Sequence, residues 1–236
     1  MADLLKINRL RSHMKQDETK NWALVTGFGS FPGVEKNPTE ELMHYICKYF
    51  SSQHIDIHTF ILDVSFQRSA KQLICHLQSN SLSPLFLLHF GVSRSPYLRI
   101  EKQAINEKNA SIHDIDGISY RGVPIDPKYT LTKSLFSSIQ IDKLMQHLQK
   151  IGYPTKISND AGRYVCNSTY YHSLQWTQSQ PVSNTITSIF IHVPTNNCVY
   201  FEDNRQFVWT SKVLCEATKV ILDWMIEEHM NQSITS

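Results

Sequence analysis

One cysteine in this chain stands at the junction of a predicted strand and a predicted helix. Cys166 follows a small-residue turn at 161–162, after the β-branched segment 155–158, which predicts a strand. Residues 170–174 behind it predict one face of a helix. Amides at a helix start lack intrahelical partners and lie at the positive end of the helix dipole. Such a position stabilises a thiolate and a developing oxyanion, although packing as a small buried hydrophobe is the commoner role of a cysteine.

A histidine at the end of another predicted strand is the candidate base. His192 closes the segment 186–193. Because ligands of open α/β sheets bind at the carboxyl ends of strands, we expect His192 to face Cys166. A cysteine with a histidine base is a standard route to a thiolate at neutral pH. The pair also needs an acid that orients the imidazole, and the residue types alone do not choose among Glu101, Asp114, Asp116 and Asp160.

Simpler structural roles compete with these chemical ones. Glu101 is flanked by two basic residues, which is typical of a solvated surface charge. For Asp160 the simpler role is to cap the helix that carries Cys166. A histidine at a strand end is more often structural than catalytic. From the residues alone, a Cys/His hydrolase with an unknown substrate is the hypothesis that remains.

The elements that must position these residues alternate along the chain. Strands are predicted at 22–26, 55–62, 85–90, 155–158 and 186–193. Helices are predicted from Asn37-Pro38 onward, over 70–77 and 141–148, after Cys166, and from about Arg205 to Met230. Residues 94–136 show little periodicity and are expected as extended segments and loops. This alternation predicts the α/β class: a single-domain three-layer α/β/α sandwich with a mostly parallel central sheet.

Bulk properties indicate one ordinary globular domain. We expect a polar, partly disordered arm over 1–20, one domain over 21–230, and a tail over 231–236. Of the 236 residues 41% are hydrophobic and 19% charged, and the net charge of +2 is too small to favour nucleic acid or an acidic membrane as partner. No signal peptide or membrane-length apolar run is evident. Five cysteines without a Cys-x-x-Cys pair favour free thiols in a cytoplasmic protein.

Other ligand motifs are absent from the sequence. The loop 27–33 begins as a dinucleotide-binding loop does, but Pro32 stands where the third glycine is needed and removes an amide. No P-loop is present, and no H-E-x-x-H or clustered His/Asp pattern indicates a metal. The sequence therefore predicts no cofactor and no metal site.

Four blocks in this order resemble the pyroglutamyl-peptidase I family of cysteine peptidases. They are Val-Thr-Gly-Phe-Gly-Ser-Phe at 25–31 with Asn37-Pro38, Ile-Glu-Lys-Gln-Ala-Ile-Asn at 100–106, the cysteine block at 158–167, and Ile-His-Val-Pro at 191–194. The match spans about residues 22–228. The segment Asp-Ala-Gly-Arg-Tyr at 160–164, with Tyr170-Tyr171 after it, looks more like the sequences of the animal-type members than those of the bacterial ones.

The resemblance implies a role for each matching residue. Cys166 would be the nucleophile, His192 the general base and then acid, and Glu101 the acid that orients His192. The substrates implied are peptides with an N-terminal pyroglutamate, and the oligomeric state, monomer or homo-oligomer, stays undecided. The positions that would surround the pyroglutamyl ring are Phe28, Phe31, Tyr164 and Val165.

Some positions depart from the family pattern. Bacterial members usually have proline at Ser30 and glycine at Pro32, so the backbone shape of the first loop is open. They also have an arginine at the position of Ser111, which the animal-type members lack. Two alternatives therefore stand beside the enzyme: a catalytically weak relative that binds pyroglutamyl or similar cyclic ligands, and an unrelated Cys/His amidase on the same kind of sheet.

Overall fold

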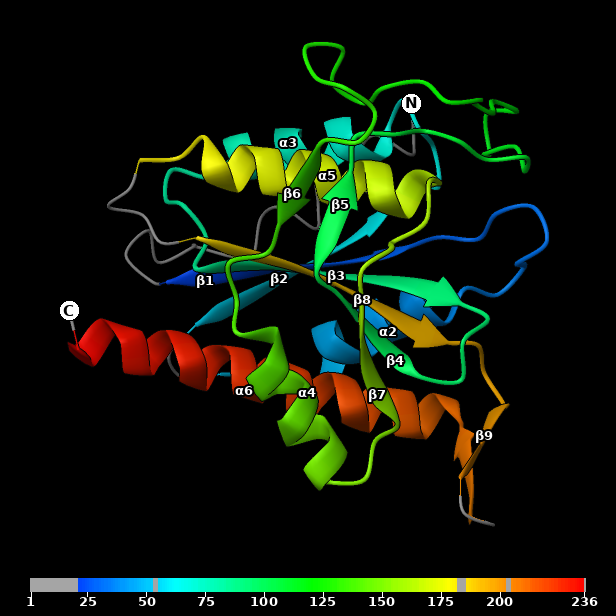
Figure 1. The fold of residues 1–236 in the computed structure, drawn as a ribbon. Coiled ribbons are helices and arrows are strands. Elements are labelled where there is room, and N and C mark those ends of the chain that lie inside the picture. Colours follow the sequence, from blue (N-terminus) through cyan, green and yellow to red (C-terminus); the bar gives the residue numbers. More distant parts are fainter. Residues whose placement is uncertain (1–20, 53–54, 182–185, 203–204, 236) are drawn as a thin grey trace, which may run out of the picture.

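The central sheet of the protein carries helices on both of its faces. The structure is a computed structural model that describes residues 21–52, 55–181, 186–202 and 205–235, so the predicted arm, 1–20, lies outside the described residues. The strand order is β2-β1-β3-β8-β4-β7 (Figure 1). The bounds are β1 Trp22–Phe28, β2 Asp56–Leu62, β3 Phe86–Ser93, β4 Leu98–Glu101, β7 Thr155–Ser158 and β8 Thr187–Pro194.

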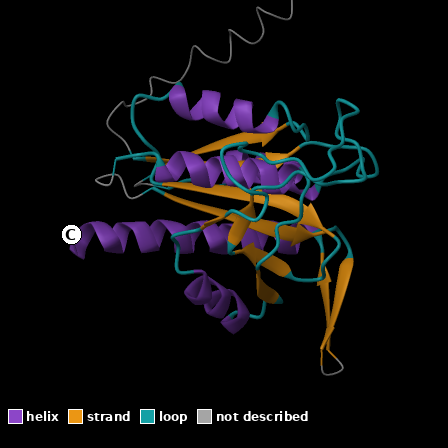
Figure 2. Ribbon diagram, turned by 45° about the horizontal axis from the view of Figure 1, so that its top comes forward, coloured by secondary structure: helices purple, strands orange, loops and turns teal. Residues whose placement is uncertain are grey.

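Helices α3 (Ser69–Gln78) and α5 (Val165–Gln178) cover one face of this sheet. Helices α2 (Pro38–Tyr49), α4 (Ile141–Lys150) and α6 (Ser211–Thr235) cover the other, and both views show the three layers (Figures 1 and 2). Each interface between sheet and helices holds its own cluster of buried apolar side chains. The predicted α/β/α sandwich is confirmed.

Strands β1 and β8 are buried along their whole length, as expected for strands covered on both faces. Helix α2 begins as predicted: the Asn37 side chain accepts a hydrogen bond from the amide of Thr39, and Pro38 occupies the first turn. This cap also fixes the loop after β1, because Asn37 donates to the carbonyl of Gly29 at 2.9 Å.

Two strands of the central sheet run against the others. Strands β1, β2, β3 and β8 are mutually parallel, which confirms a mostly parallel sheet. Strand β4 is antiparallel to β8, and β7 is parallel to β4. The end of β7 therefore does not share an edge with the end of β8, and residues 159–164 must lead the chain back to the start of α5.

Residues 94–136, for which extended segments and loops are predicted, contain short strands. Besides β4 they include β5 (Gln103–Ile105) and β6 (Ser134–Phe136), which pair as a separate antiparallel ribbon. The prediction that a helix begins near Arg205 is wrong. Strands β9 (Cys198–Glu202) and β10 (Arg205–Trp209) form a hairpin there, rich in the aromatic and β-branched residues that favour strands. Helix α6 continues to Thr235, so 231–235, predicted as a tail, are helical.

A buried polar chain joins the sheet to helix α5. His89 on β3 is fully buried; its Nδ1 lies 2.8 Å from Thr26 Oγ1 and its Nε2 lies 2.7 Å from Ser173 Oγ. Ser173 in turn lies 2.8 Å from Ser188 Oγ on β8. Burial lowers the pKa of His89 to about 3, because the charged imidazolium would lose its hydration.

We expect this histidine to make the fold acid-sensitive. Its pKa is lower in the folded chain than in the unfolded one, so the unfolded state binds more protons between about pH 6.5 and the folded value, and stability falls as pH falls. The loss is about 2 kcal/mol between pH 6.5 and pH 4.5. Urea unfolding across that range measures it. His89→Gln should flatten the slope, and an unchanged slope would contradict the account.

Candidate active site

Cys166 lies in the first turn of α5 and is half-buried. The N-cap of this helix is Tyr164, two residues before Cys166, and its backbone is extended. The Tyr164 side chain makes no capping hydrogen bond within the described residues. Its hydroxyl instead donates to the carbonyl of His113 at 2.9 Å. This helix start thus has no side-chain cap, and the amides of a helical first turn can hold an anion.

His192 and Glu101 form a buried pair beside this thiol. Nδ1 of His192 lies 2.8 Å from Oε1 of Glu101, and the two residues are 6% and 0% exposed. Cys166 and His192 line the same pocket. Burial alone lowers the pKa of His192, but its interactions with Cys166 and Glu101 outweigh burial and raise it to about 9. The arrangement favours an imidazolium at neutral pH.

The other acidic candidates point elsewhere. Asp114 is buried but accepts hydrogen bonds from the amides of Phe66, Asp116 and Ile118. Asp116 pairs with Arg68, and Asp160 pairs with Arg163. Among the described residues, Glu101 is the carboxylate that the structure brings to His192.

A small apolar pocket opens beside the thiol and the imidazole. Its volume is about 190 Å³. The lining residues are Phe28, Phe31, Asn37, Val64, Val92, Ile112, Ala161, Tyr164, Cys166 and His192. Three of the four side chains expected around a ring are therefore present. Val165 is the exception: it is fully buried in the apolar cluster under α3 and α5 and does not line the pocket.

Three residues that contact the site were given no role from the sequence. Gly91 on β3 pairs in register with His192. Asn167 ties the start of α5 to β5: its Oδ1 accepts from the amide of Ile105 at 2.9 Å, and its Nδ2 donates to the Ile105 carbonyl at 2.8 Å. Arg99 lies 3.3 Å from Glu101. Two of them gave a signal in the sequence. Gly91 follows the apolar strand predicted over 85–90, at the strand end where ligands bind, and a polar residue directly after the cysteine must find a partner when it is buried.

Gly91→Ala should impair the site. A Cβ at this position would lie 2.8 Å from the Phe190 ring and 3.1 Å from Cys166 Sγ. Phe190 also packs against His192, with ring centroids 4.8 Å apart, so its displacement moves the imidazole as well. We expect a loss of kcat/KM of roughly tenfold or more, since small misplacements of reacting groups are costly. Kinetics together with the melting temperature check this; a wild-type kcat/KM would contradict it.

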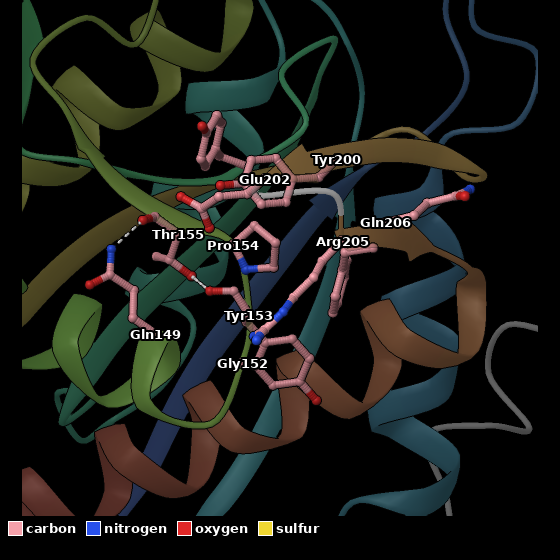
Figure 3. Close-up of a pocket in the computed structure, with 11 residues that line it drawn as sticks. Gln149, Gly152, Tyr153, Pro154, Thr155, Tyr200, Glu202, Arg205 and Gln206 are labelled. Atoms are coloured by element: carbon pink, nitrogen blue, oxygen red, sulfur yellow. Dashed lines mark hydrogen bonds between the residues drawn. The ribbon is translucent and has the colours of Figure 1, made fainter.

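A larger hollow lies away from this site. It measures about 800 Å³ and lies between the β9–β10 hairpin and the start of β7 (Figure 3). Aromatic side chains and a few polar ones line it: Tyr97, Tyr153, Tyr200, Phe207, Gln149, Glu202, Arg205 and Gln206. Cys166, His192 and Glu101 are not among its lining residues. Size alone therefore does not mark the chemical site.

Within the described residues, no group of three or more His, Cys, Asp or Glu side chains is placed to hold a metal ion. In the same part of the chain, every helix is too short or too polar to span a bilayer. All five cysteines are free thiols.

The site combines a thiol, a buried imidazole and a carboxylate that contacts the imidazole, and an apolar pocket lies beside them. On an α/β/α sandwich, this combination defines a protein of the cysteine hydrolase class. The pyroglutamyl peptidase family model matches residues 21–213. The chain is similar to the pyrrolidone-carboxylate peptidase of Pyrococcus furiosus, 35% identical over 176 residues, which covers 72% of this chain and 79% of the relative. The same enzyme of Halalkalibacterium halodurans is 31% identical over 176 residues, covering 75% and 85%. The chain therefore belongs to the pyroglutamyl peptidase family.

Solved structures agree with this assignment. The pyrrolidone carboxyl peptidase of Fervidobacterium islandicum matches with a TM-score of 0.77 at 27% identity, covering 88% of this chain and 99% of that one. A mutant of the Pyrococcus furiosus enzyme matches with a TM-score of 0.75 at 29% identity, over 88% and 99%. The fold and the family are thus supported independently.

Proposed function

We propose that this protein is a cysteine exopeptidase that removes an N-terminal pyroglutamyl residue from peptides. One observation carries the proposal: Cys166 in the first turn of α5 and His192 line the same small apolar pocket, and His192 pairs with the buried Glu101. Membership of the family supplies the substrate class. Pyroglutamate is a neutral lactam, so apolar walls with a few backbone partners suit it, whereas an ordinary N-terminal ammonium would lose its hydration there.

The reaction that this geometry supports is acyl transfer. The thiolate of Cys166 attacks the carbonyl carbon that joins pyroglutamate to the next residue, and the oxyanion is held by amides of the first turn of α5. His192 then gives its proton to the leaving amine as the C–N bond breaks, which leaves a thioester on Cys166. Water, activated by the now neutral His192, hydrolyses the thioester and restores the thiolate and the imidazolium. Glu101 holds the imidazole in orientation throughout.

A panel of aminocoumarin substrates tests the proposed specificity. Pyroglutamyl-aminocoumarin should be cleaved, while prolyl- and glutaminyl-aminocoumarin, which carry a charged amine, should be cleaved at least about 10²-fold more slowly. Similar rates on all three would contradict a lactam pocket. Binding of pyroglutamate without any turnover in reductant would instead support the alternative of a catalytically weak relative.

The pH profile should show the raised pKa of His192. Because leaving-group protonation needs the imidazolium, we expect kcat/KM to fall on the alkaline side near pH 9. Glu101→Gln removes one of the negative charges that raise this pKa, so its alkaline limb should lie at lower pH, and its maximal rate should also drop. An unchanged limb and rate would remove Glu101 from the orienting role.

The proposal also covers the location of the protein, its kinship within the family and its domain organisation. A cytoplasmic location is supported by the free cysteines. Closer kinship to the animal-type members is supported by the wording of residues 160–164 and by Ser111; a tree that groups the chain within bacterial sequences would refute it. The division into an arm, 1–20, and one catalytic domain predicts that a chain starting at residue 21 keeps full activity.

A further inference from the structure

The Glu101 carboxylate is held out of water with little compensation. Its side chain is 0% exposed, and among the described residues its ion pairs are those with His192, at 2.8 Å, and Arg99, at 3.3 Å. Both pairs use Oε1; Oε2 has no hydrogen-bond partner in that part of the chain. A buried carboxylate without sufficient compensation takes up a proton instead. His192 and Arg99 are therefore the two partners that balance the charge of this carboxylate.

Arg99 contacts both Glu101 and the chain segment that leads to Cys166. It precedes Glu101 by two residues on β4, so the two side chains share a face of the sheet. In the register of β4 with β8, Arg99 lies opposite His192. Its Nη2 also donates to Ser158 Oγ at 2.7 Å and to the carbonyl of Asp160. One guanidinium thus contacts both the orienting acid and the segment 159–164 that leads to the nucleophile.

Charge balance gives this contact a function. In the reactive state the Cys166 thiolate and the Glu101 carboxylate carry two negative charges, which the His192 imidazolium and Arg99 balance. Without Arg99 the buried group carries a net negative charge, and it takes up a proton at a higher pH than before. Wherever that proton binds, on the carboxylate or on the sulfur, the reactive state is lost.

We propose that Arg99 is a positioning residue for the reaction, which balances the buried charge beside His192 and holds Glu101 toward that imidazole. The inference rests on the proposed function. Arg99 does not line the pocket and acts through Glu101. A purely structural role is the competing explanation, in which Arg99 only clamps the segment 159–164. That role would lower the rate by the same factor at every pH.

The acid limb of kcat/KM separates the two roles. The titratable and charged groups that face this cluster are Glu101 and Arg99 on β4, Cys166 and Tyr170 on α5, His192 on β8, and Asp160, Arg163, Tyr164 and Glu107 beside it. In Arg99→Met the acid limb should move up by about one pH unit, since removing a nearby cation favours protonation. Below that limb kcat/KM should fall roughly tenfold. Arg99→Lys keeps the charge and should hold the limb near the wild-type position.

Arg163→Met is the matched control. Arg163 lies on the same segment and its side chain is 25% exposed, against 24% for Arg99, but it pairs with Asp160 and Glu107 rather than with Glu101. Its acid limb should stay at the wild-type pH. Profiles are measured with pyroglutamyl-aminocoumarin, and circular dichroism checks that each variant is folded.

Two results would overturn the proposal: an acid limb of Arg99→Met at the wild-type pH, whatever its rate, or an equal shift in Arg163→Met. Should Arg99→Met fail to fold, Arg99→Gln takes its place, because the amide can still donate to Ser158 while the charge is gone. A wild-type protein that cleaves no pyroglutamyl substrate would refute the proposed function itself, so the two failures are distinguishable.

Discussion

Cys166→Ala should abolish the cleavage of pyroglutamyl substrates, with a loss of at least about 10⁴-fold in kcat. The variant removes the atom that forms the acyl-enzyme, and the remaining pocket and oxyanion donors cannot replace it. The change deletes a single half-buried sulfur, so the fold should persist. Initial rates in reductant, with a thermal melt of each protein, measure both effects.

Two controls sharpen this prediction. Cys215→Ala removes a buried thiol of helix α6 and should cleave at the wild-type rate. Cys166→Ser keeps an oxygen nucleophile of similar size and should retain little activity, because a hydroxyl is far less ionised than a thiol beside the same base. Turnover by Cys166→Ala at a tenth of the wild-type rate or more would assign the nucleophile elsewhere.

His192→Asn should have the second largest effect, a loss of about 10³- to 10⁴-fold. An asparagine can still donate a hydrogen bond toward Glu101, but it can neither activate the thiol nor protonate the leaving amine. The alkaline limb near pH 9 should disappear with it, because that limb reports the proton on His192.

His172→Asn provides the comparison for this variant. His172 lies on the same helix as Cys166, and partial burial lowers its pKa, whereas the charges around His192 raise that of His192. The His172 variant should keep both its rate and its alkaline limb. A limb that persists in His192→Asn would mean that another group titrates there.

The positions of Cys166 and His192, the proposed nucleophile and base, could be predicted because local patterns mark both. A small-residue turn before a helical segment placed Cys166 at a helix start, and the apolar run 186–193 placed His192 at a strand end. The expectation that both residues follow strands running in the same direction was only partly right. Strand β7 runs opposite to β8, and the chain returns over residues 159–164 before α5 begins.

The acid could not be chosen from local pattern. Glu101 is buried because the four-residue strand β4 is inserted between β8 and β7, and nothing in residues 98–101 predicts an antiparallel insertion. Its basic neighbours suggested a surface charge, yet Arg99 is its ion-pair partner. The resemblance to a family supplied Glu101, and the register of β4 against β8 supplies the physical reason.

The pocket shows the same division between local and tertiary information. Phe28, Phe31 and Tyr164 line it as expected, since they flank the loop after β1 and the start of α5. Val165, the first residue of α5, is instead fully buried in the apolar cluster. Ile112 lines the pocket from a segment without periodicity, which only the folded chain brings there.

An affinity label tests the central claim most directly. Pyroglutamyl chloromethyl ketone carries the proposed recognition group and alkylates a thiolate that lies within its reach. We predict that peptide mapping finds the label on Cys166, in step with the loss of turnover, while the more exposed Cys47 and Cys75 stay unlabelled. Excess pyroglutamyl peptide should protect. Label on the exposed cysteines with turnover retained, or no protection by the peptide, would contradict a Cys166 nucleophile beside a pyroglutamyl pocket.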